Sequence, residues 1–394
     1  MRILHILTQK PFATGSGTYF TESIKALHKL GHKQAAVVGV EAEENFNCLP
    51  DVAYYSVRFS TEELPFHVVG MSNSMPYPST RYNQLTPLMA AQMEKAFIEK
   101  IESVLTDFVP DLIVCHHLYL LTALVREHFP QYKIVGISHG SDLRQLQTTE
   151  LQKERIVSNI RKLDVIFALH RQQQLLISEL FALPLERIKI LGTGYSAAVF
   201  YNKNYVKKTE PQKIIFAGKI SYKKGLASLL RALQEMKHDR KFELYLAGSY
   251  SSEQEYKGIV ELARSMDYPV TFCGALTQGE LAEAFNRCQL MVLPSFYEGL
   301  PLVIMEALAC GLKVVTTDLP GVQDWLKMNI PNNKIIFVKP PRVVQVDEPL
   351  VEDLPAFEKA LGEAISRVLV DDITYQENLS QVTWDSVAKR LLQQ

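Results

Sequence analysis

Twelve short aliphatic runs, spread along the whole chain, constrain the fold of this sequence most strongly. They occupy residues 2–7, 35–40, 111–116, 133–139, 165–170, 188–192, 213–218, 242–248, 270–274, 290–295, 313–317 and 334–338. Helical patterns, such as those at residues 17–31, 226–237 and 279–288, lie between most of them. Uninterrupted apolar strands that alternate with helices are typical of parallel sheets covered on both faces. The sequence therefore predicts an α/β fold with two doubly wound units.

The length of 394 residues also favours two domains, because it exceeds what one ordinary core accommodates. The charged stretch at residues 200–213 separates the two series of runs and is the best linker candidate. Two regions break the pattern. Residues 41–87 are rich in Pro, Ser and Asn and too long for an ordinary connection, so we expect a functional loop there. Residues 339–355 fit a surface excursion.

The overall composition excludes several classes of function. The 42 basic and 43 acidic residues nearly cancel, which argues against a general binding surface for nucleic acid or an anionic membrane. The five cysteines are scattered and lack metal-ligand spacing, so we expect reduced thiols. The first residues do not resemble a signal peptide, and no segment is long and apolar enough to span a bilayer. A cytoplasmic location is expected.

Ligands of open α/β sheets bind at the carboxyl ends of the strands, so motifs that directly follow the apolar runs are the best candidates for binding sites. Gly15 and Gly17 open a helix after the first run, where small residues allow a phosphate to approach backbone N–H groups. A loop that merely leads into a helix is the alternative. A dinucleotide fingerprint is disfavoured, because Phe20 stands where its third glycine belongs.

Charged residues follow two runs of the second half. Lys219 and Lys224 surround the loop after residues 213–218, where they could neutralise a diphosphate or simply be solvated. Glu298 precedes an apolar helix and Glu306 lies within it. A carboxylate among apolar neighbours needs hydrogen-bond donors, and a diol such as ribose suits it, although a Glu that reaches solvent is the alternative. Eight residues of helix span about 12 Å, too far for a glycosidase pair.

Four segments together resemble one family, the glycosyltransferases of family 4. These enzymes are retaining, use nucleotide sugars and have the GT-B architecture. The segments are residues 294–315, with two glutamates separated by seven residues, and residues 216–225, 13–32 and 383–392. The resemblance implies two Rossmann-like domains that face each other across a cleft. Residues 1–200 would form the acceptor domain, 201–375 the donor domain, and 376–394 a helix that crosses back to the first domain.

The resemblance also implies roles for the glycines and lysines. Gly15 and Gly17 would lie beside the donor diphosphate, and Lys219 and Lys224 would form its cationic clamp. The family often has Arg where Lys219 stands. Lysine keeps the charge but loses bidentate geometry.

Roles follow for the glutamate motif as well. Glu306 would bind the ribose hydroxyls, and Glu298 the hydroxyls of the donor sugar. Pro301 stands where many relatives have Gly and donates no hydrogen bond. We therefore expect Leu302 and Val303 to supply the remaining amides.

The first domain is expected to hold the acceptor. His139 follows a strand and matches the functional histidine of the family near the reacting carbon, although a structural histidine at a strand end is the alternative. His116 and His117 end another strand and resemble a family position that faces the cleft, which makes His116 a candidate for acceptor binding. In the irregular segment at residues 70–82, Tyr77 and Arg81 are candidates for the acceptor pocket, although a surface loop packed on the sheet is the alternative.

These expectations define a reaction. A hexosyl or N-acetylhexosaminyl group would move from a UDP- or GDP-sugar to a hydroxyl of a glycan or small molecule, with retention of configuration. No cofactor or metal is expected, because no Asp-x-Asp motif follows a strand and lysines supply the charge. A nucleotide-sugar epimerase of the same architecture and a silent sugar-nucleotide binding protein are the alternatives. Residues 192–196 depart from the family pattern at the expected hinge.

Overall fold

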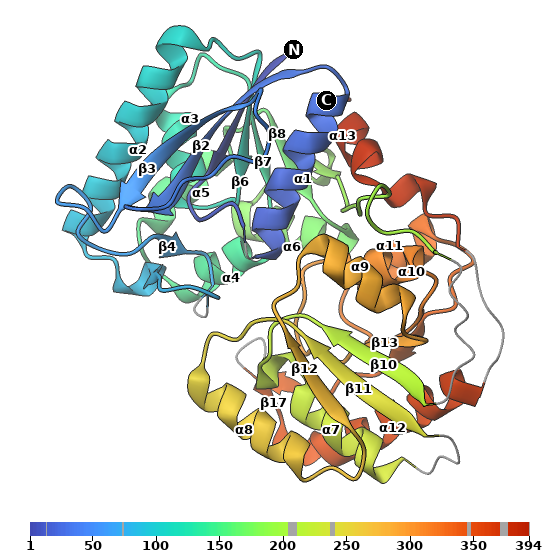
Figure 1. Ribbon diagram of the computed structural model, residues 1–394. Helices are drawn as coiled ribbons and strands as arrows, with labels where there is room; N and C mark the ends of the chain where they lie inside the picture. Colours follow the sequence, from blue (N-terminus) through green and yellow to red (C-terminus); the bar gives the residue numbers. More distant parts are fainter. Residues whose placement is uncertain are drawn as a thin grey trace. The chain divides into compact units, whose positions relative to one another are not determined.

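The computed structural model describes residues 1–12, 14–72, 75–203, 211–236, 241–344, 348–370 and 377–393. The chain divides into two compact units (Figure 1). Unit 1 comprises Met1–Thr193 and Trp384–Gln394, and unit 2 comprises Gly194–Thr383. Residues 204–210 of the predicted linker and the predicted boundary at 375 and 376 lie outside the described residues. The division into an acceptor and a donor domain stays a prediction.

Unit 1 is built on a seven-stranded parallel sheet in the order β3-β2-β1-β6-β7-β8-β9. Its strands are β1 (Arg2–Leu7), β2 (Lys33–Glu41), β3 (Ala53–Phe59), β6 (Leu112–His116), β7 (Ile134–Ile137), β8 (Val165–Ala168) and β9 (Ile188–Ile190). The chain adds β2 and β3 on one side of β1 and then crosses to β6 on the other side. The point where the strand order reverses therefore lies between β1 and β6.

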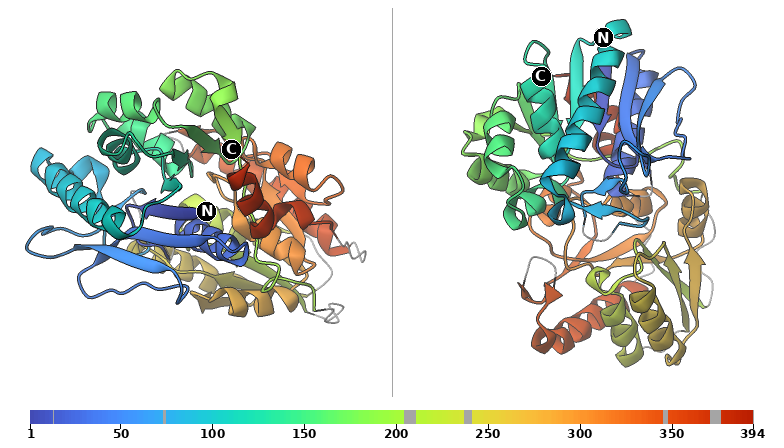
Figure 2. Two further views of the ribbon diagram at one scale, coloured as in Figure 1. Left: turned by 90° about the horizontal axis from the view of Figure 1, so that it is seen from above. Right: turned by 90° about the vertical axis from the view of Figure 1, so that its left-hand side faces the viewer.

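Helices cover both faces of this sheet (Figures 1 and 2). They are α1 (Gly15–Lys29), α2 (Pro87–Asp107), α3 (Leu120–His128), α4 (Ser141–Thr148), α5 (Lys153–Ile160), α6 (Arg171–Phe181) and α13 (Trp384–Leu392). Strand residues alternate between the faces. Leu4 and Ile6 of β1 belong to the core that includes α2 and α3, whereas Leu7 belongs to the core that includes Phe20 of α1. His5 therefore points to the α1 face, where its ring meets Phe20.

The last helix, α13, belongs to unit 1 although the chain has passed through unit 2 before it forms. It packs along α1, as the neighbouring red and blue helices of Figure 1 show. Trp384 meets the ring of Tyr19 edge-on with centroids 4.9 Å apart, and Lys29 forms an ion pair with Asp385 at 2.5 Å. The buried aromatic contact carries more free energy than the exposed ion pair.

Unit 2 repeats the architecture with a six-stranded parallel sheet in the order β12-β11-β10-β13-β14-β15. Its strands are β10 (Gln212–Ala217), β11 (Phe242–Ala247), β12 (Val270–Gly274), β13 (Leu290–Leu293), β14 (Lys313–Thr317) and β15 (Ile336–Val338). Its helices are α7 (Leu226–Glu235), α8 (Glu253–Arg264), α9 (Gln278–Asn286), α10 (Leu302–Ala309), α11 (Val322–Asn329) and α12 (Leu354–Val370). The strand order reverses between β10 and β13.

The remaining elements are short. Two-residue strands pair as β4 (Val69–Gly70) with β5 (Thr80–Arg81), in parallel, and as β16 (Val343–Val344) with β17 (Glu348–Pro349), antiparallel. The 3-10 helices are η1 (Tyr82–Gln84), η2 (Leu185–Arg187), η3 (Tyr222–Lys224), η4 (Val351–Asp353) and η5 (Ser380–Val382).

The predicted fold class is confirmed: each of the twelve aliphatic runs contains a strand of one of the two parallel sheets. The prediction for residues 41–87 is wrong in one part, because β3 forms there and pairs along its length with β2. Val57 and Phe59 of β3 are buried, whereas Arg58 between them is exposed. This alternation is typical of an edge strand, and the polar residues around it obscured the pattern.

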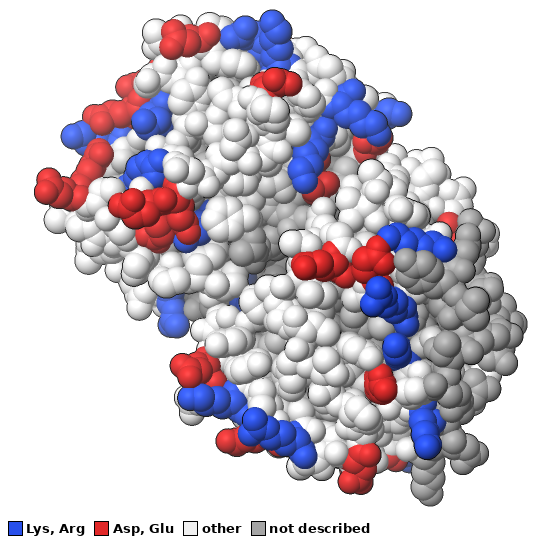
Figure 3. Space-filling view, in the orientation of Figure 1, with Lys and Arg blue, Asp and Glu red and all other residues white. Residues whose placement is uncertain are grey.

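Basic and acidic side chains are mixed on the face of the molecule that Figure 3 shows. Among the described residues, no helix combines the length and the apolar character needed to cross a membrane.

Candidate functional site

The two points of strand reversal predict where ligands bind. In an open α/β sheet, the crevice outside the carboxyl ends of the strands is widest where neighbouring loops turn in opposite directions. In unit 2 these are the loops after β10 and β13, and in unit 1 the loops after β1 and β6. Most of the site residues predicted from the sequence lie on these loops or on the helices that follow them.

Close backbone packing holds the two loops of unit 2 together. Gly225 has a φ of +70°, and a Cβ atom there would lie 2.1 Å from the carbonyl oxygen of Pro294, which follows β13. Only glycine fits this combination of left-handed backbone and close approach. The N–H of Phe296 also donates to the carbonyl of Lys223 at 3.1 Å. These contacts fix η3 beside the loop from β13 to α10.

This arrangement brings together Lys224 and Glu298, which are 74 residues apart in the sequence. Lys224 Nζ lies 2.6 Å from Glu298 Oε1, and the side chains are 25% and 16% exposed. Lys219, on the same loop as Lys224, is mostly buried, and its pKa is lowered to about 8 by burial and by repulsion from Lys224, against the attraction of Glu255 and Glu298. An anion beside these lysines would be attracted by both cations, and Glu255 and Glu298 offset part of that attraction.

The helix that follows β13 places three more predicted residues. Glu306 is only 7% exposed, in the middle of α10 among buried apolar residues. Leu302 and Val303 form the first turn of α10 after Pro301, the N-cap residue, and both are partly exposed. The first N–H groups of a helix have no acceptor within it. The start of α10 therefore offers amide donors at the strand-reversal point.

In unit 1, the loop after β1 is closed by its own hydrogen bonds. The Thr14 hydroxyl caps α1 by accepting from the N–H of Gly17 at 3.0 Å, and Gln9 Nε2 donates to Thr14 and Ser16. A Cβ atom at Gly17 would lie 2.8 Å from the N of Phe12, whereas one at Gly15 would meet nothing within 4 Å. Gly17 is thus required by packing, and its amide is already used. Gly15 and Ser16 lie in the first turn of α1, where N–H groups have no acceptor within the helix, so their amides are candidate donors for an anion.

Four histidine rings gather near α1: one comes from within β1, two from the carboxyl end of β6 and one from the loop after β7. His116 ends β6, and His139 follows β7; their rings are stacked, with an interplanar angle of 6° and His116 Nδ1 3.1 Å from His139 Nε2. His117 meets His139 edge-on at a centroid distance of 4.9 Å, and His5 lies 6.4 Å from His116. We call these four residues the histidine cluster.

Aromatic side chains from α1 cover the histidine cluster. Tyr19 meets His139 edge-on at 5.0 Å and donates its hydroxyl to the carbonyl of Gly192, and Phe20 packs on His116 at 5.1 Å. His116 is 2% exposed, whereas His139 is partly exposed. Burial lowers the pKa of both rings well below its ordinary value, and each is further lowered by neighbouring histidines. Both rings are therefore neutral at pH 7.

Burial also governs the other two rings. It lowers the pKa of His5 to about 4, against the hydrogen bond that His5 Nε2 donates to Gln34 Oε1, which raises it. It lowers the pKa of His117 to about 4, against the charge of Asp142. The histidine cluster therefore consists of neutral imidazoles.

One carboxylate that the sequence analysis missed organises the loops of the histidine cluster. Asp142 is fully buried; its Oδ1 accepts from the N–H of His139 and the hydroxyl of Ser138, both at 3.1 Å. Its Oδ2 accepts from the N–H of Leu118 at 2.7 Å. Asp142 thereby ties the loop after β6 to the loop after β7. An Asp in the first turn of a helix, three residues after His139, was the available signal.

The segment at residues 70–82 is anchored to the loop after β1 and to helix α4. The N–H of Met71 donates to Gln9 Oε1 at 3.2 Å, and the Met71 carbonyl accepts from Gln145 Nε2 of α4 at 3.1 Å. Met71, Met75 and Tyr82 are buried, so their apolar side chains contribute to packing and not to the exposed surface. Residues 73 and 74 lie outside the described residues.

The two predicted acceptor residues of this segment differ in exposure. Tyr77 is largely buried, with its ring 4.6 Å from Lys10 Nζ, and its buried hydroxyl has no hydrogen-bond partner within the described part of the chain. Lys10, itself 3% exposed, forms an ion pair with Glu44 at 2.5 Å. Arg81 is exposed at the end of β5. Arg81 is therefore the more exposed of the two residues.

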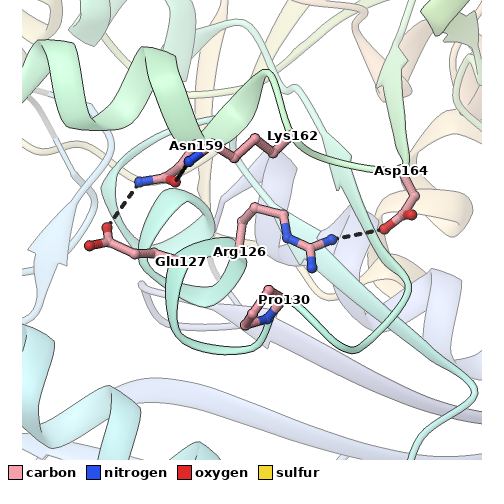
Figure 4. A pocket seen from close by; sticks show the side chains of 6 residues that line it. All are labelled: Arg126, Glu127, Pro130, Asn159, Lys162 and Asp164. Carbon is pink, nitrogen blue, oxygen red and sulfur yellow. Dashed lines mark hydrogen bonds and ion pairs between the residues drawn. The ribbon is translucent and has the colours of Figure 1, made fainter.

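A surface pocket of about 380 Å³ lies elsewhere on unit 1 (Figure 4). It is lined by Arg126, Glu127, Pro130, Asn159, Lys162 and Asp164. Pro130 precedes β7 and Asp164 precedes β8, so the pocket lies at the amino ends of these strands, away from the histidine cluster. Arg126 pairs with Asp164 at 3.0 Å, and Asn159 donates to Glu127, so these polar groups are already paired with one another. Within the described parts of the chain, no group of three or more His, Cys, Asp or Glu side chains could hold a metal ion.

Comparisons with known proteins show which sequences this chain resembles. Residues 200–347 match the family model of glycosyl transferases group 1. A lipopolysaccharide 1,2-N-acetylglucosaminetransferase of Salmonella typhimurium is 22% identical over 88% of this chain and 87% of its own length. An uncharacterized glycosyltransferase of Methanocaldococcus jannaschii is 20% identical over 54% of this chain, and a glycogen synthase of Mycobacterium tuberculosis is 28% identical over 37%. The chain spans 55% and 35% of the length of these last two relatives.

Solved structures show the fold. The chain is similar to sucrose-phosphate synthase from Thermosynechococcus elongatus, with a TM-score of 0.69, 17% identity and coverage of 100% of this chain and 97% of that one. It is also similar to HepE of Anabaena in complex with UDP and glucose, with a TM-score of 0.65, 14% identity and coverage of 100% and 98%. The fold is therefore that of the GT-B glycosyltransferases.

Proposed function

We propose that this chain is a retaining glycosyltransferase of the family 4 type. It transfers a hexosyl or N-acetylhexosaminyl group from a UDP- or GDP-sugar to a hydroxyl of a glycan or small molecule. One observation carries the proposal: Lys219, Lys224 and Glu298 lie on the two loops at the strand-reversal point of unit 2. Two cations beside a carboxylate suit the diphosphate and the hydroxyl groups of a nucleotide sugar.

Each residue of unit 2 has a distinct task in this proposal. Lys219 and Lys224 stabilise the negative charge that develops on the leaving diphosphate, so a metal ion is not needed. Glu306 accepts from the ribose hydroxyls and Glu298 from those of the sugar. The amides of Leu302 and Val303 at the start of α10 donate to phosphate or sugar oxygens.

Unit 1 supplies the acceptor side in this proposal. His139 lies near the reacting carbon, and the segment at residues 70–82 contacts the acceptor through Tyr77 and Arg81. The amides of Gly15 and Ser16 approach the diphosphate. The acetylglucosaminetransferase relative and the UDP complex of HepE support a nucleotide sugar as the donor. All five cysteines are free, which supports a reducing compartment such as the cytoplasm.

The experiment pairs donor binding with turnover in the presence of EDTA. A donor at a hundredfold excess over its Kd should raise the free energy of unfolding of unit 2 by about 2.7 kcal/mol. A panel of UDP- and GDP-sugars therefore identifies the donor by thermal shift, and that donor is then incubated with glycan acceptors. We expect sugar transfer without added metal. An epimerised donor without transfer would favour an epimerase, and binding without turnover a silent binding protein; both outcomes would contradict the proposal.

A further inference from the structure

One hydrogen bond within the histidine cluster determines what chemistry His139 can offer. His116 Nδ1 and His139 Nε2 are 3.1 Å apart, in rings that lie nearly parallel. Both rings are neutral at pH 7, because burial and the neighbouring histidines lower the pKa of each. A neutral imidazole carries one N–H and one acceptor nitrogen. One of the two nitrogens must therefore donate and the other accept.

The surroundings of His116 decide which nitrogen donates. His116 Nε2 is buried and has no hydrogen-bond partner among the residues that the structure describes. A proton on Nε2 would leave a buried N–H without an acceptor, and such orphaned donors are rarer in proteins than unpaired acceptors. A proton on Nδ1 leaves only an unpaired acceptor at Nε2 and makes the bond to His139. His116 thus donates, and His139 Nε2 accepts.

The consequence falls on the other nitrogen of His139. Because Nε2 is occupied as an acceptor, the single proton of the neutral ring lies on Nδ1. We propose that His116 is a positioning residue that fixes His139 in the Nδ1–H tautomer, so that His139 meets the substrate as a hydrogen-bond donor and not as a proton acceptor. This inference rests on the proposed function, since it takes His139 as part of the reaction site.

Backbone contacts around the histidine cluster keep the rings of His116 and His139 in contact. Asp142 accepts from the N–H of His139 and from the N–H of Leu118, so the loops that carry the two rings share one carboxylate. His117 has a φ of +73°, a left-handed conformation that is uncommon for residues other than glycine. This turn allows two consecutive residues, His116 and His117, to contact the ring of His139, one stacked and one edge-on. Such a strained position persists only where its surroundings fix it.

The direct test reads the tautomer of His139 by long-range ¹H–¹⁵N NMR of the full chain labelled at its ten histidines, without any nucleotide sugar. A His139→Gln variant assigns the signals. We expect a protonated Nδ1 and a bare Nε2 at pH 7. A proton on Nε2, or a mixture of both tautomers, would overturn the inference. Because no donor or acceptor is present, this result is independent of whether the proposed transfer occurs.

Variants then separate positioning from packing. His116→Phe keeps a stacked ring but removes the donor, so His139 should populate both tautomers and kcat should fall about tenfold or more. His116→Asn places an amide N–H near the position of Nδ1 and should restore the tautomer and most of kcat. His117→Asn, which tolerates the left-handed backbone, is the matched control and should leave the tautomer unchanged. An unaltered tautomer in His116→Phe would remove the positioning role.

Discussion

Acidification should unfold unit 1 at lower urea concentrations while unit 2 changes little. His5 and His117 are 0% and 1% exposed, and the pKa of each is lowered to about 4 in the folded chain. In the unfolded chain the pKa of each ring returns to about 6.5. Between these two values the unfolded chain binds more protons than the folded one. The free energy of unfolding is therefore fully retained above pH 6.5 and falls as the pH drops toward 4.

The size of the effect follows from the two pKa values. At pH 5 each of the two rings lowers the free energy of unfolding by about 2 kcal/mol relative to pH 8, or about 4 kcal/mol together. The lowered pKa values of His116 and His139 act in the same direction. A domain with a total stability of about 5–15 kcal/mol should show a large shift of its urea midpoint.

The two tryptophans of the chain allow each unit to be followed separately. Trp384 is buried in unit 1, where it packs on Tyr19, and Trp325 is buried on α11 of unit 2. Trp325→Phe leaves a fluorescence probe of unit 1, and Trp384→Phe leaves one of unit 2. Nine of the ten histidines belong to unit 1. We expect the unit 1 midpoint to fall steeply from pH 8 to pH 5 and the unit 2 midpoint to stay nearly constant.

A single substitution tests the assignment to the histidine cluster. His117→Asn removes one titrating ring and suits the left-handed backbone, so the loss of stability between pH 8 and pH 5 should shrink by about 2 kcal/mol. A unit 1 midpoint that is flat over this range, or a His117→Asn variant with the full pH dependence, would refute the reasoning.

Three further predictions concern unit 2. Binding of a nucleotide diphosphate should raise the lowered pKa of Lys219, so titration calorimetry near pH 8.5 in buffers of different ionisation enthalpy should detect proton uptake that Lys219→Met abolishes. Glu306→Gln should weaken binding of free UDP or GDP, whereas Glu298→Gln releases Lys224 from its ion pair and should keep nucleotide binding while transfer falls. Gly225→Ala should destabilise unit 2 by about 2 kcal/mol or more, as urea unfolding measures, because its backbone is left-handed and tightly packed.

Each of these predictions has a clear opposite. Equal nucleotide affinity in the two glutamine variants would remove the separate tasks of the carboxylates, and proton uptake that persists in Lys219→Met would move it to another group. Gly279→Ala is the matched control for Gly225→Ala, because a Cβ atom at Gly279 meets nothing within 4 Å and its φ is not positive. Equal stability of the two alanine variants would show that the approach of the loops is not tight.

The sequence predicted the architecture well because buried parallel strands are apolar throughout. Runs such as residues 290–293 and 313–317 carry enough signal alone to be recognised as strands. Strand β3 could not be recognised in this way, because an edge strand buries fewer of its side chains and Arg58 interrupts the apolar pattern. Its neighbours, rich in Pro and Ser, drew attention to a loop instead.

The site was predictable where a residue follows a strand and unpredictable where it depends on distant partners. His116, His139, Lys219 and Glu298 could be located by position alone. The ion pair of Lys224 with Glu298 could not, because it depends on how two loops 74 residues apart approach each other.

Buried partners were equally hidden. Asp142 joins two loops through backbone N–H groups, and His5 enters the histidine cluster from the middle of a strand. Neither role leaves a periodic pattern in the sequence. The hydrogen bond from the Gly17 N–H to the Thr14 hydroxyl was hidden in the same way. The sequence of a glycine loop does not show whether its amides bond within the loop or can bind a ligand.

The proposed transfer itself is tested most directly by ¹H NMR of a nucleotide sugar in real time. The chain is incubated with UDP- and GDP-sugars in EDTA, with a simple sugar as acceptor, and the anomeric signal of the first product is followed. We expect that one donor is consumed and that the product keeps the anomeric configuration of the donor. Lys224→Ala should slow the reaction about a hundredfold through lost leaving-group stabilisation. A product of inverted configuration, or no consumption of any donor by the wild-type chain, would contradict it.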